Sequence, residues 1–216
     1  MSPYQYHIIA VDGPAASGKS SVSRRLANQL GLAFVSSGLM YRAFTWLVCE
    51  SPIDIDDADA IIALMKETTF QAARRGNELY ITVNGQDPGD ALTSDRVNSN
   101  VSKIATIPEV REVLVAEQRA CGNTTDIVME GRDIGSVVFP DTSFKFYLDA
   151  SEEVRAQRRA DQGLQDEIAE RDRVDSTRKA SPLKVADGAI VVDTSTMDLN
   201  QVVAALANHL KTLGFP

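Results

Sequence analysis

The segment VDGPAASGKSS, at positions 11–21, constrains the fold of this chain more than any other stretch of its 216 residues. It matches the pattern G-x-x-x-x-G-K-S/T, with Gly13, Gly18, Lys19 and Ser20 at the defining positions. An apolar run, HIIAV, leads into it, and apolar residues spaced four apart follow it. These flanks predict a buried strand before the loop and an amphipathic helix after it.

A loop of this form between a strand and a helix binds phosphate groups. Its glycines let successive backbone N–H groups point inward, and the positive end of the following helix faces the same anion. Lys19 is then placed to reach the β- and γ-phosphates, and the hydroxyl of Ser20 to coordinate Mg²⁺. The loop therefore predicts binding of ATP or GTP with Mg²⁺, and it leaves the reaction open.

Strands and helices alternate along most of the remaining chain. Further strands are predicted for LAFVSSG, DIVMEG, FKFYLDA and AIVVDT, which are short apolar-rich runs bounded by polar or small residues. Helices are predicted for MYRAFTWLVCE and for residues 108–120, 152–162, 165–174 and 199–210. This order is typical of an α/β fold, here a three-layer sandwich whose central parallel sheet is covered by helices on both faces.

The region from about residue 52 to residue 96 departs from this alternation. A helix-like piece, DADAIIALMK, is followed by alternating segments around the dipeptides Gly76-Asn77 and Asn84-Gly85. Such dipeptides are typical of tight turns between antiparallel strands. We interpret the region as a small strand-rich subdomain inserted into a single domain, whose core is formed by about residues 1–51 and 97–216.

Charge and composition argue against several classes of protein. The formal net charge of −8 disfavours a protein that coats nucleic acid or an anionic membrane. The sequence has no run of about 18 apolar residues and no basic segment followed by a long apolar one at its start, so neither a membrane span nor a secretory signal is predicted. Cys49 and Cys121 are far apart, as expected of free thiols in a reducing compartment. We therefore expect a cytoplasmic protein with small-molecule partners and without nucleic-acid or membrane partners.

The short length of the chain narrows the kind of nucleotide-binding protein. The guanine-reading tetrapeptide N/T-K-x-D does not occur in the sequence, which argues against a GTP-specific switch protein. A motor or a helicase needs a longer chain and further motifs. A phosphate loop this early in a chain this short indicates a kinase that acts on a small molecule or a nucleotide.

Candidate residues for the phosphoryl acceptor follow the predicted strands. Ser37 and Arg42 come after the second strand, and Arg132 and Asp133 come directly after the strand DIVM. Because ligands of a parallel sheet gather at the carboxyl ends of its strands, these side chains are expected at the mouth of the site. Arginine suits phosphate because its planar guanidinium can hold two oxygens at once. Arg132 with Asp133 is either a reader of phosphate and base or a structural ion pair.

The segment from residue 155 to residue 178 is rich in arginine, with six arginines, no lysine and six acidic residues. One interpretation is an exposed helix stabilised by ion pairs, since Glu167 and Arg171 have the favourable i, i+4 order. The other is a lid whose arginines, Arg158 and Arg159 among them, close over the transferring phosphates. Both can hold for one segment, and we expect a short lid at about residues 158–172.

Six motifs follow one another along the chain: DGPAASGKSS, SSGLMYR, VREVLVAEQR, EGRDIGSVVFPD, FYLDAS and ERDRVDSTR. The same motifs occur in this order in the bacterial cytidylate (CMP/dCMP) kinases, a family of P-loop nucleoside monophosphate kinases that this chain resembles over essentially its whole length. The strand-rich insert also fits the enlarged monophosphate-binding region of that family. The resemblance implies a P-loop NTPase fold, Mg²⁺ as cofactor, and ATP-dependent phosphorylation of CMP and dCMP to CDP and dCDP in pyrimidine metabolism.

The resemblance further implies roles for individual residues. The ATP phosphates would be wrapped by the lid residues Arg158 and Arg159 and by the loop residues Gly13, Pro14, Ala15, Ala16, Ser17, Gly18, Lys19, Ser20 and Ser21. The acceptor's 5′-phosphate would be held by Arg42, Arg132 and Arg171. Cytosine would be read by Ser37, Ser102, Arg111, Asp133 and Arg178, and the pentose hydroxyl would be bound by Asp175. The catalytic residues would be Lys19, Arg132, Asp133, Arg158 and Arg171.

Three features depart from the family pattern. Glu130 stands where many members carry Asp, and Val174 stands where Arg is expected. The segment between Arg159 and Arg171 is shorter than in many members. The reaction class that the resemblance implies is unaffected, because the departures leave the phosphate loop and the segment GRDIGSVVFP intact.

Two other functions stay open on the residues alone. Another small-molecule P-loop kinase, acting for example on shikimate or dephospho-coenzyme A, would share the phosphate loop, but the hairpin insert and Gly131-Arg132-Asp133 disfavour it. A non-catalytic nucleotide sensor would bind ATP without needing a second phosphate site made of arginines. For the kinase that the resemblance implies, we expect a monomer.

Overall fold

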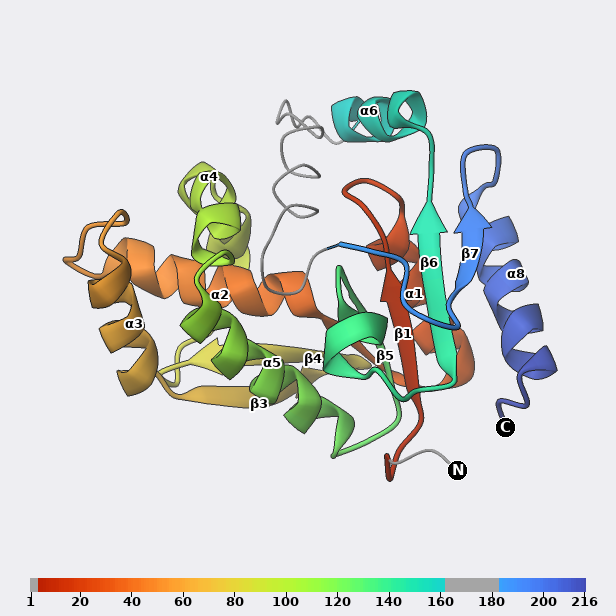
Figure 1. Cartoon of the computed structure of the whole chain (residues 1–216), viewed down its shortest axis with the longest axis horizontal. Helices are drawn as coiled ribbons and strands as arrows, with labels where there is room; N and C mark the ends of the chain where they lie inside the picture. The colour runs from red at the N-terminus through yellow and green to blue at the C-terminus, as the bar shows by residue number, and fades with distance from the viewer. Residues whose placement is uncertain (1–3, 162–182) are drawn as a thin grey trace.

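The computed structural model describes residues 4–161 and 183–216, and the predicted helix at 165–174 lies outside them (Figure 1). The described strands form one sheet in the order β3-β4-β2-β5-β1-β6-β7. The strands are β1 Ile8–Asp12, β2 Ala33–Ser36, β3 Phe70–Arg75, β4 Glu78–Val83, β5 Ile127–Gly131, β6 Phe144–Asp149 and β7 Ile190–Asp193. The described helices are α1 Lys19–Leu30, α2 Ser37–Glu50, α3 Ala58–Glu67, η1 Gly89–Thr93, α4 Asp95–Ile104, α5 Pro108–Gly122, η2 Ile134–Val138, α6 Glu152–Asp161 and α8 Leu199–Thr212.

The sheet is parallel except at β3, which runs antiparallel to β4. Strand β1 lies in its interior, paired with β5 on one edge and with β6 on the other. Strands β1, β6 and β7 all point toward α6, so their carboxyl ends lie on one side of the molecule (Figure 1). The predicted α/β fold with a central, mostly parallel sheet is confirmed.

Each face of the sheet has its own apolar core, because successive residues of a strand point to opposite faces. In β1, Ile8 and Ala10 belong to the cluster that includes residues of α2 and α5, whereas Ile9 and Val11 belong to the cluster that includes α1 and α8. Burial on both faces explains why this strand is apolar at consecutive positions rather than at alternate ones. The three-layer arrangement follows from these two cores.

The hairpin predicted in the insert is present as β3 and β4. The strands turn at Gly76-Asn77, where Gly76 has a φ of 60°, and Asn84 and Gly85 form the second predicted turn with φ values of 50° and 74°. The hairpin does not form a sheet of its own, because β4 pairs in parallel with β2. The insert therefore covers the hydrogen-bonding edge of β2 and extends the central sheet. The division of the chain into core, insert and lid stays a prediction.

Helix α4 is not among the elements predicted from the sequence. Its residues Val97, Val101 and Ile104 are buried at a spacing of four and three, and the last two pack in a third apolar cluster with residues of α2, α3 and α5. This spacing is a helical signal that the adjoining turn residues obscured. Cys49 and Cys121 are buried free thiols, as predicted. No helix of the described residues is long and apolar enough to cross a membrane.

A buried carboxylate fastens the connection after β5 to the end of β1. Asp12 is 2% exposed, and its Oδ1 and Oδ2 accept the backbone N–H groups of Ile134 at 2.7 Å and Gly135 at 2.8 Å. These two residues open the π-helix η2, in which the N–H of Phe139 donates to the carbonyl of Ile134. Burial raises the pKa of the Asp12 carboxyl from 3.8 to about 7, and the two N–H donors oppose this rise because they favour the ionised form.

Gly122, at the end of α5, occupies a position where a side chain does not fit. A Cβ there would lie 2.8 Å from Cζ of Phe139 and 2.9 Å from Cδ1 of Ile8, and both side chains are buried. We expect Gly122→Ala to lower the free energy of unfolding by about 1–3 kcal/mol through overpacking, although alanine is the better helix former. Urea denaturation measures the change. The control is Asn123→Ala at the exposed next residue, for which a change below about 0.5 kcal/mol is expected. Equal losses in the two variants would contradict the prediction.

The raised pKa of Asp12 makes the stability of the fold depend on pH. Because the folded value of about 7 exceeds the model value of 3.8, the folded chain binds a proton at Asp12 that the unfolded chain releases. The associated stability is fully present below about pH 4 and is lost as the pH rises through about 7. We expect the free energy of unfolding of the parent, relative to Asp12→Asn, to fall by up to about 1.4 kcal/mol per pH unit across this window. Urea titrations at several pH values test this, and parallel pH profiles for the two proteins would contradict it.

Candidate active site

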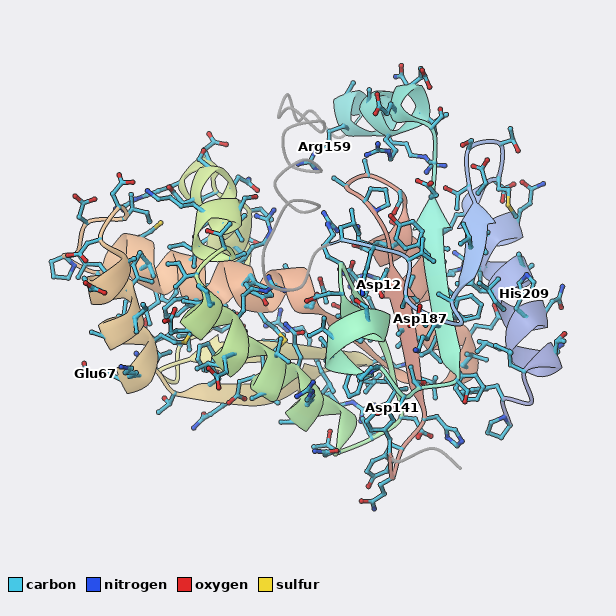
Figure 2. All side chains as sticks on the ribbon, in the orientation of Figure 1. Asp12, Glu67, Asp141, Arg159, Asp187 and His209 are labelled. Carbon is cyan, nitrogen blue, oxygen red and sulfur yellow. The ribbon has the colours of Figure 1, made fainter. Side chains whose placement is uncertain are left out.

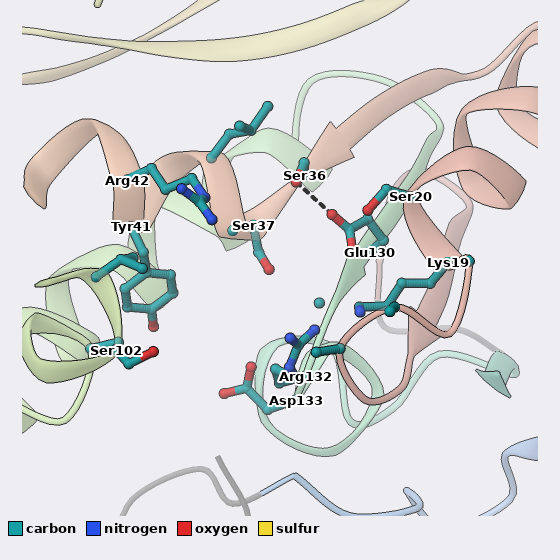
Figure 3. A pocket seen from close by; sticks show the side chains of 18 of the residues that line it. Lys19, Ser20, Ser36, Ser37, Tyr41, Arg42, Ser102, Glu130, Arg132 and Asp133 are labelled. Carbon is teal, nitrogen blue, oxygen red and sulfur yellow. Dashed lines mark hydrogen bonds between the residues drawn. The ribbon is translucent and has the colours of Figure 1, made fainter. Parts of the chain in front are cut away.

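A cavity of about 320 Å³ opens beside the loop that follows β1 and the ends of β2 and β5. Its walls come from that loop and the start of α1, from α2, α4 and α5, from the end of β5 with the residues that follow it, and from α6 (Figure 3). The volume is in the range typical of small-molecule sites. Ligands of open α/β sheets bind outside the carboxyl ends of the strands, so the cavity is where a ligand is expected.

The loop from Gly13 to Gly18 shapes its side of the cavity largely with backbone. A Cβ at Gly13 would lie 2.2 Å from the carbonyl oxygen of Leu148 on β6, so only glycine fits there. Ala16 and Gly18 have φ values of 58° and 90°, and this conformation costs an alanine energy. Within the described residues no side chain caps the start of α1, and its first turn has no acidic residue. The N–H groups and positive end of this helix therefore suit an anion.

The side chains on this side of the cavity are one cation and several oxygen groups. Nζ of Lys19, which is buried, donates to the carbonyl of Pro14 at 2.8 Å, so the amino group lies within the curve of the loop. Oγ of Ser36 donates to Oε1 of the buried Glu130 at 2.5 Å. Figure 3 shows Glu130 beside Ser20 and Lys19. The part of the cavity beside the loop therefore combines a positive charge with a carboxylate and a hydroxyl group.

Two arginines of α6 hold the loop from behind. Arg155 donates to the carbonyl of Ala15 at 3.3 Å, and Arg158 donates to the carbonyl of Ser17 at 3.2 Å. Arg158 also donates to the hydroxyl and the carbonyl of Thr194, at 3.1 and 2.8 Å. These bonds satisfy the carbonyl groups of Ala15 and Ser17 in the loop.

The far side of the cavity contains a buried ion pair. Nη2 of Arg111 on α5 lies 2.5 Å from Oδ2 of Asp133, and the two residues are 3% and 4% exposed. The guanidinium also donates to the carbonyl of Ala105 at 3.2 Å and lies over the ring of Tyr41, 5.3 Å from its centroid. These contacts hold a donor and an acceptor side by side in a place that water cannot easily reach. Asp133 thus pairs with Arg111, which the sequence placed in a different element, 22 residues away.

Further arginines lie between the two sides. Arg42 on α2 donates to the carbonyl of Leu92 at 3.0 Å and to Oδ1 of Asn98 at 2.6 Å, so the strand-rich insert and α4 orient it. Arg132 follows β5, and Figure 3 shows its guanidinium near the amino group of Lys19. Both arginines line the same cavity as the phosphate loop. The cavity can therefore accept two anionic groups, one at the loop and one at the arginines.

The structure brings most of the predicted site residues together. The residues of the predicted set that line the cavity are Ala15, Ala16, Gly18, Lys19, Ser20, Ser21, Ser37, Arg42, Ser102, Arg111, Arg132, Asp133 and Arg159. The described residues of the set that do not line it are Gly13, Pro14, Ser17 and Arg158, all within or against the phosphate loop. Arg171, Asp175 and Arg178 lie outside the described residues. Their roles, and those of the lining residues, stay predictions.

Several lining residues were not among those predicted from the sequence. Ser36 and Tyr41 directly precede the predicted residues Ser37 and Arg42 in the motif SSGLMYR. Val101 directly precedes Ser102 on α4, and Ala105 follows the last residue of that helix. The sequence signal that could have identified all four residues is their closeness along the chain to a predicted site residue. Glu130 also lines the cavity, although in the sequence it stands out only as a departure from the family pattern.

Comparison with known proteins gives a consistent result along the whole chain. A family model for cytidylate kinase matches residues 9–212. A cytidylate kinase from Geobacillus sp. (strain WCH70) is 39% identical over 206 residues, which cover 90% of this chain and 92% of that protein. Cytidylate kinases from Clostridium botulinum (strain Langeland) and Nocardia farcinica are each 39% identical, and they cover 94% and 93% of this chain. The matched segments are 97% and 91% of those two proteins.

The matched region contains both the phosphate loop and the arginines that line the same cavity. Matches of this extent and identity show common descent along the whole domain rather than a shared loop alone. The chain belongs to the cytidylate kinase family.

Proposed function

We propose that this protein transfers the γ-phosphoryl group of ATP to CMP and dCMP, which yields CDP and dCDP. The observation that carries the proposal is a single cavity with two kinds of binding group. The phosphate loop with Lys19 forms one side, the buried Arg111–Asp133 pair forms the other, and Arg42 and Arg132 lie between them. Membership of the cytidylate kinase family supports the same reaction.

The arginines account for how the acceptor phosphate is held. Arg42 and Arg132 enter the cavity from α2 and from the residues after β5, so they can hold one phosphate from two directions. The attacking oxygen of a nucleoside monophosphate is already anionic near neutral pH, so the reaction needs no strong general base. Catalysis then consists of placing the two phosphates in line and of cancelling charge at the transferring group, for which Lys19 and Arg132 are suited.

The buried pair accounts for recognition of cytosine. The base presents an amino group as donor, with ring nitrogen and carbonyl acceptors beside it. Asp133 can accept from that amino group while Arg111 donates to the neighbouring acceptors, and Ser37 and Ser102 line the same region. Uracil carries an acceptor where cytosine carries the amino donor, so it would meet the Asp133 carboxylate with the wrong partner. The site thereby favours cytidine nucleotides.

The oxygen groups at the donor side fit Mg²⁺. Magnesium prefers hard oxygen ligands and in kinases is bound by one or two protein groups together with the substrate phosphates. The hydroxyl of Ser20 lies at the start of α1 and the Glu130 carboxylate lies beside it, held by Ser36 (Figure 3). When bound with ATP, the ion would neutralise charge on the β- and γ-phosphates. We assign Ser20 as its protein ligand, with Glu130 close to its water ligands.

The remaining assignments concern the lid and the number of chains. Arg159 lines the cavity and would contact ATP, and Arg158 would set the position of the loop through its bond to Ser17. Arg171, Asp175 and Arg178, which lie outside the described residues, are proposed to contact the acceptor phosphate, the pentose and the base side of the pocket. One chain provides all of these groups, so we propose that the enzyme works as a monomer.

The choice of acceptor is the direct test of the proposal. We expect rapid turnover of CMP and dCMP with ATP and Mg²⁺, slower turnover of UMP, and little turnover of AMP or GMP, because among the four bases only cytosine presents an amino donor followed by a ring nitrogen and a carbonyl as acceptors. A coupled assay of ADP release across the five acceptors measures this. Good turnover of another acceptor, with none for CMP and dCMP, would refute the assignment.

The separation of donor and acceptor sites gives a second prediction. We expect Arg132→Ala to raise the KM for CMP about 10–100-fold through loss of charge-assisted hydrogen bonds, while the Kd for ATP changes less than about threefold. Steady-state kinetics and calorimetric titration with ATP measure the two values. Arg25→Ala, at an exposed arginine that bonds Asn200 away from the cavity, is the matched control and should leave both unchanged. A protein that loses ATP and CMP binding equally would argue against two separate subsites.

A further inference from the structure

Asp12 is a buried titratable group that the proposed reaction does not use. It is the last residue of β1, directly before Gly13, and it is not among the residues that line the cavity. A buried carboxylate is costly unless its oxygens have partners, and both oxygens of Asp12 have one, in the N–H groups of Ile134 and Gly135. In Figure 2, Asp12 lies at the end of β1, close to the β5–β6 connection that contains Ile134 and Gly135.

The contact joins the two halves of the site. The loop that holds the donor phosphates begins at the residue after Asp12. The acceptor residues Arg132 and Asp133 come immediately before Ile134 and Gly135, the residues that Asp12 holds. Asp12 pairs with Gly131 of β5 in the sheet. Its side chain therefore lies between the phosphate loop that follows β1 and the acceptor segment that follows β5.

The segment after Asp133 is built around this contact. The N–H groups of Val137 and Val138 both donate to the carbonyl of Asp133, which makes Asp133 part of the first turn of η2. A π-helical turn of this kind is uncommon and is often found at functional sites. Its start cannot shift along β1 without breaking two charge-assisted hydrogen bonds. Any such shift would carry Asp133 and Arg132 with it.

Gly135 allows the close approach on which the contact depends. A Cβ at this residue would lie 3.3 Å from Oδ2 of Asp12 and 3.2 Å from Cδ of Lys145, so the first turn of η2 lies between these two side chains. Lys145 is itself fixed, because its Nζ donates to the carbonyls of Pro140 at 2.5 Å and Asp187 at 3.0 Å. The start of η2 is thus fixed from both sides.

We propose that Asp12 is a positioning residue that sets the distance between the donor phosphate loop and the acceptor residues Arg132 and Asp133. This inference rests on the proposed function, because it concerns the alignment of the two phosphates. Asp12 does not contact either nucleotide in this account. It acts through the backbone of Ile134 and Gly135, so its loss should disturb alignment more than binding. Misplacement of reacting groups by about 1 Å can lower a rate on the order of 100-fold.

The test is Asp12→Asn, which keeps the size of the side chain but has one acceptor oxygen where the carboxylate has two. Its NH₂ group would face one of the two backbone N–H donors, so one contact is lost. We expect kcat with ATP and CMP at pH 8 to fall about 10–100-fold. We expect the Kd values for ATP alone and for CMP alone, from calorimetry, to stay within about threefold of the parent. A merely structural role would lower the melting temperature without this split between kcat and binding.

A second variant approaches the same contact from the other side. Gly135→Ala keeps the carboxylate but pushes η2 away from Asp12 and Lys145 by a few tenths of an ångström. We expect a smaller fall in kcat with the same retained Kd values. If Asp12→Asn cannot be purified in folded form, Gly135→Ala decides the question in its place.

The control is Thr142→Val, which affects the same connection at its opposite end. Oγ of the buried Thr142 donates to the carbonyl of Ile8, the first residue of β1, at 2.5 Å. We expect this variant to lower the melting temperature while kcat stays within about twofold of the parent. The proposal would be overturned if the folded test variant kept the kcat of the parent. It would also be overturned if Thr142→Val lowered kcat by the same factor, or if lost binding of one nucleotide explained the fall in kcat. Absence of CMP turnover in the parent would refute the proposed function instead, and the acceptor that the parent does phosphorylate would then serve for the comparison.

Discussion

The position of β1 in the interior of the sheet determines where every other part of the site can lie. All five of its residues are buried, and its two edges are hydrogen-bonded to β5 and β6. Because β1 is hydrogen-bonded at both edges and packed on both faces, it cannot shift, so the loop after it begins at a fixed point. Gly13 is then required, because the chain leaves β1 against the carbonyl of Leu148 on the neighbouring strand. The position of the phosphate loop is therefore set by the sheet rather than by the residues of the loop itself.

The candidate site is assembled from groups that reach the same end of the sheet by different routes. Arginines of α6 support the loop, helix α5 provides Arg111, and the insert with α4 orients Arg42 through Leu92 and Asn98. The pairing of β4 with β2 brings the insert to the edge of the sheet beside α2, which explains how a region so different in pattern contributes to the acceptor side. Asp12 links the acceptor segment to the central strand within the protein interior. Buried contacts of this kind hold the side chains that line a site in fixed positions.

Local patterns predicted the elements and part of the site for physical reasons that can be named. The helix after the phosphate loop ends at Gly31 in the left-handed conformation, as a C-cap glycine should, and the apolar runs appear as strands because both faces of the sheet are covered. Helix α4 was not predicted, and the insert was not placed in the central sheet. Strand pairing between β2 and β4 depends on which edges meet in space, and no local pattern carries that information. The same holds for Asp133, whose partner is Arg111 on another element rather than its neighbour Arg132.

The sequence by itself determined the chemistry that is available to this protein. The loop of glycines with Lys19 and Ser20 predicts a bound nucleoside triphosphate, and the motifs around Arg42 and Arg132 favour an anionic acceptor, because backbone freedom, charge and spacing along a strand or helix are local properties. Only the tertiary structure decided which side chains share the cavity, which arginine pairs with which carboxylate, and that the buried Asp12 binds the backbone of Ile134 and Gly135. Those features arise from contacts between residues far apart in the chain, such as Asp12 with Gly135, which are 123 positions apart. They depend on how strands and helices pack. That packing is determined by the burial of apolar side chains on both faces of the sheet.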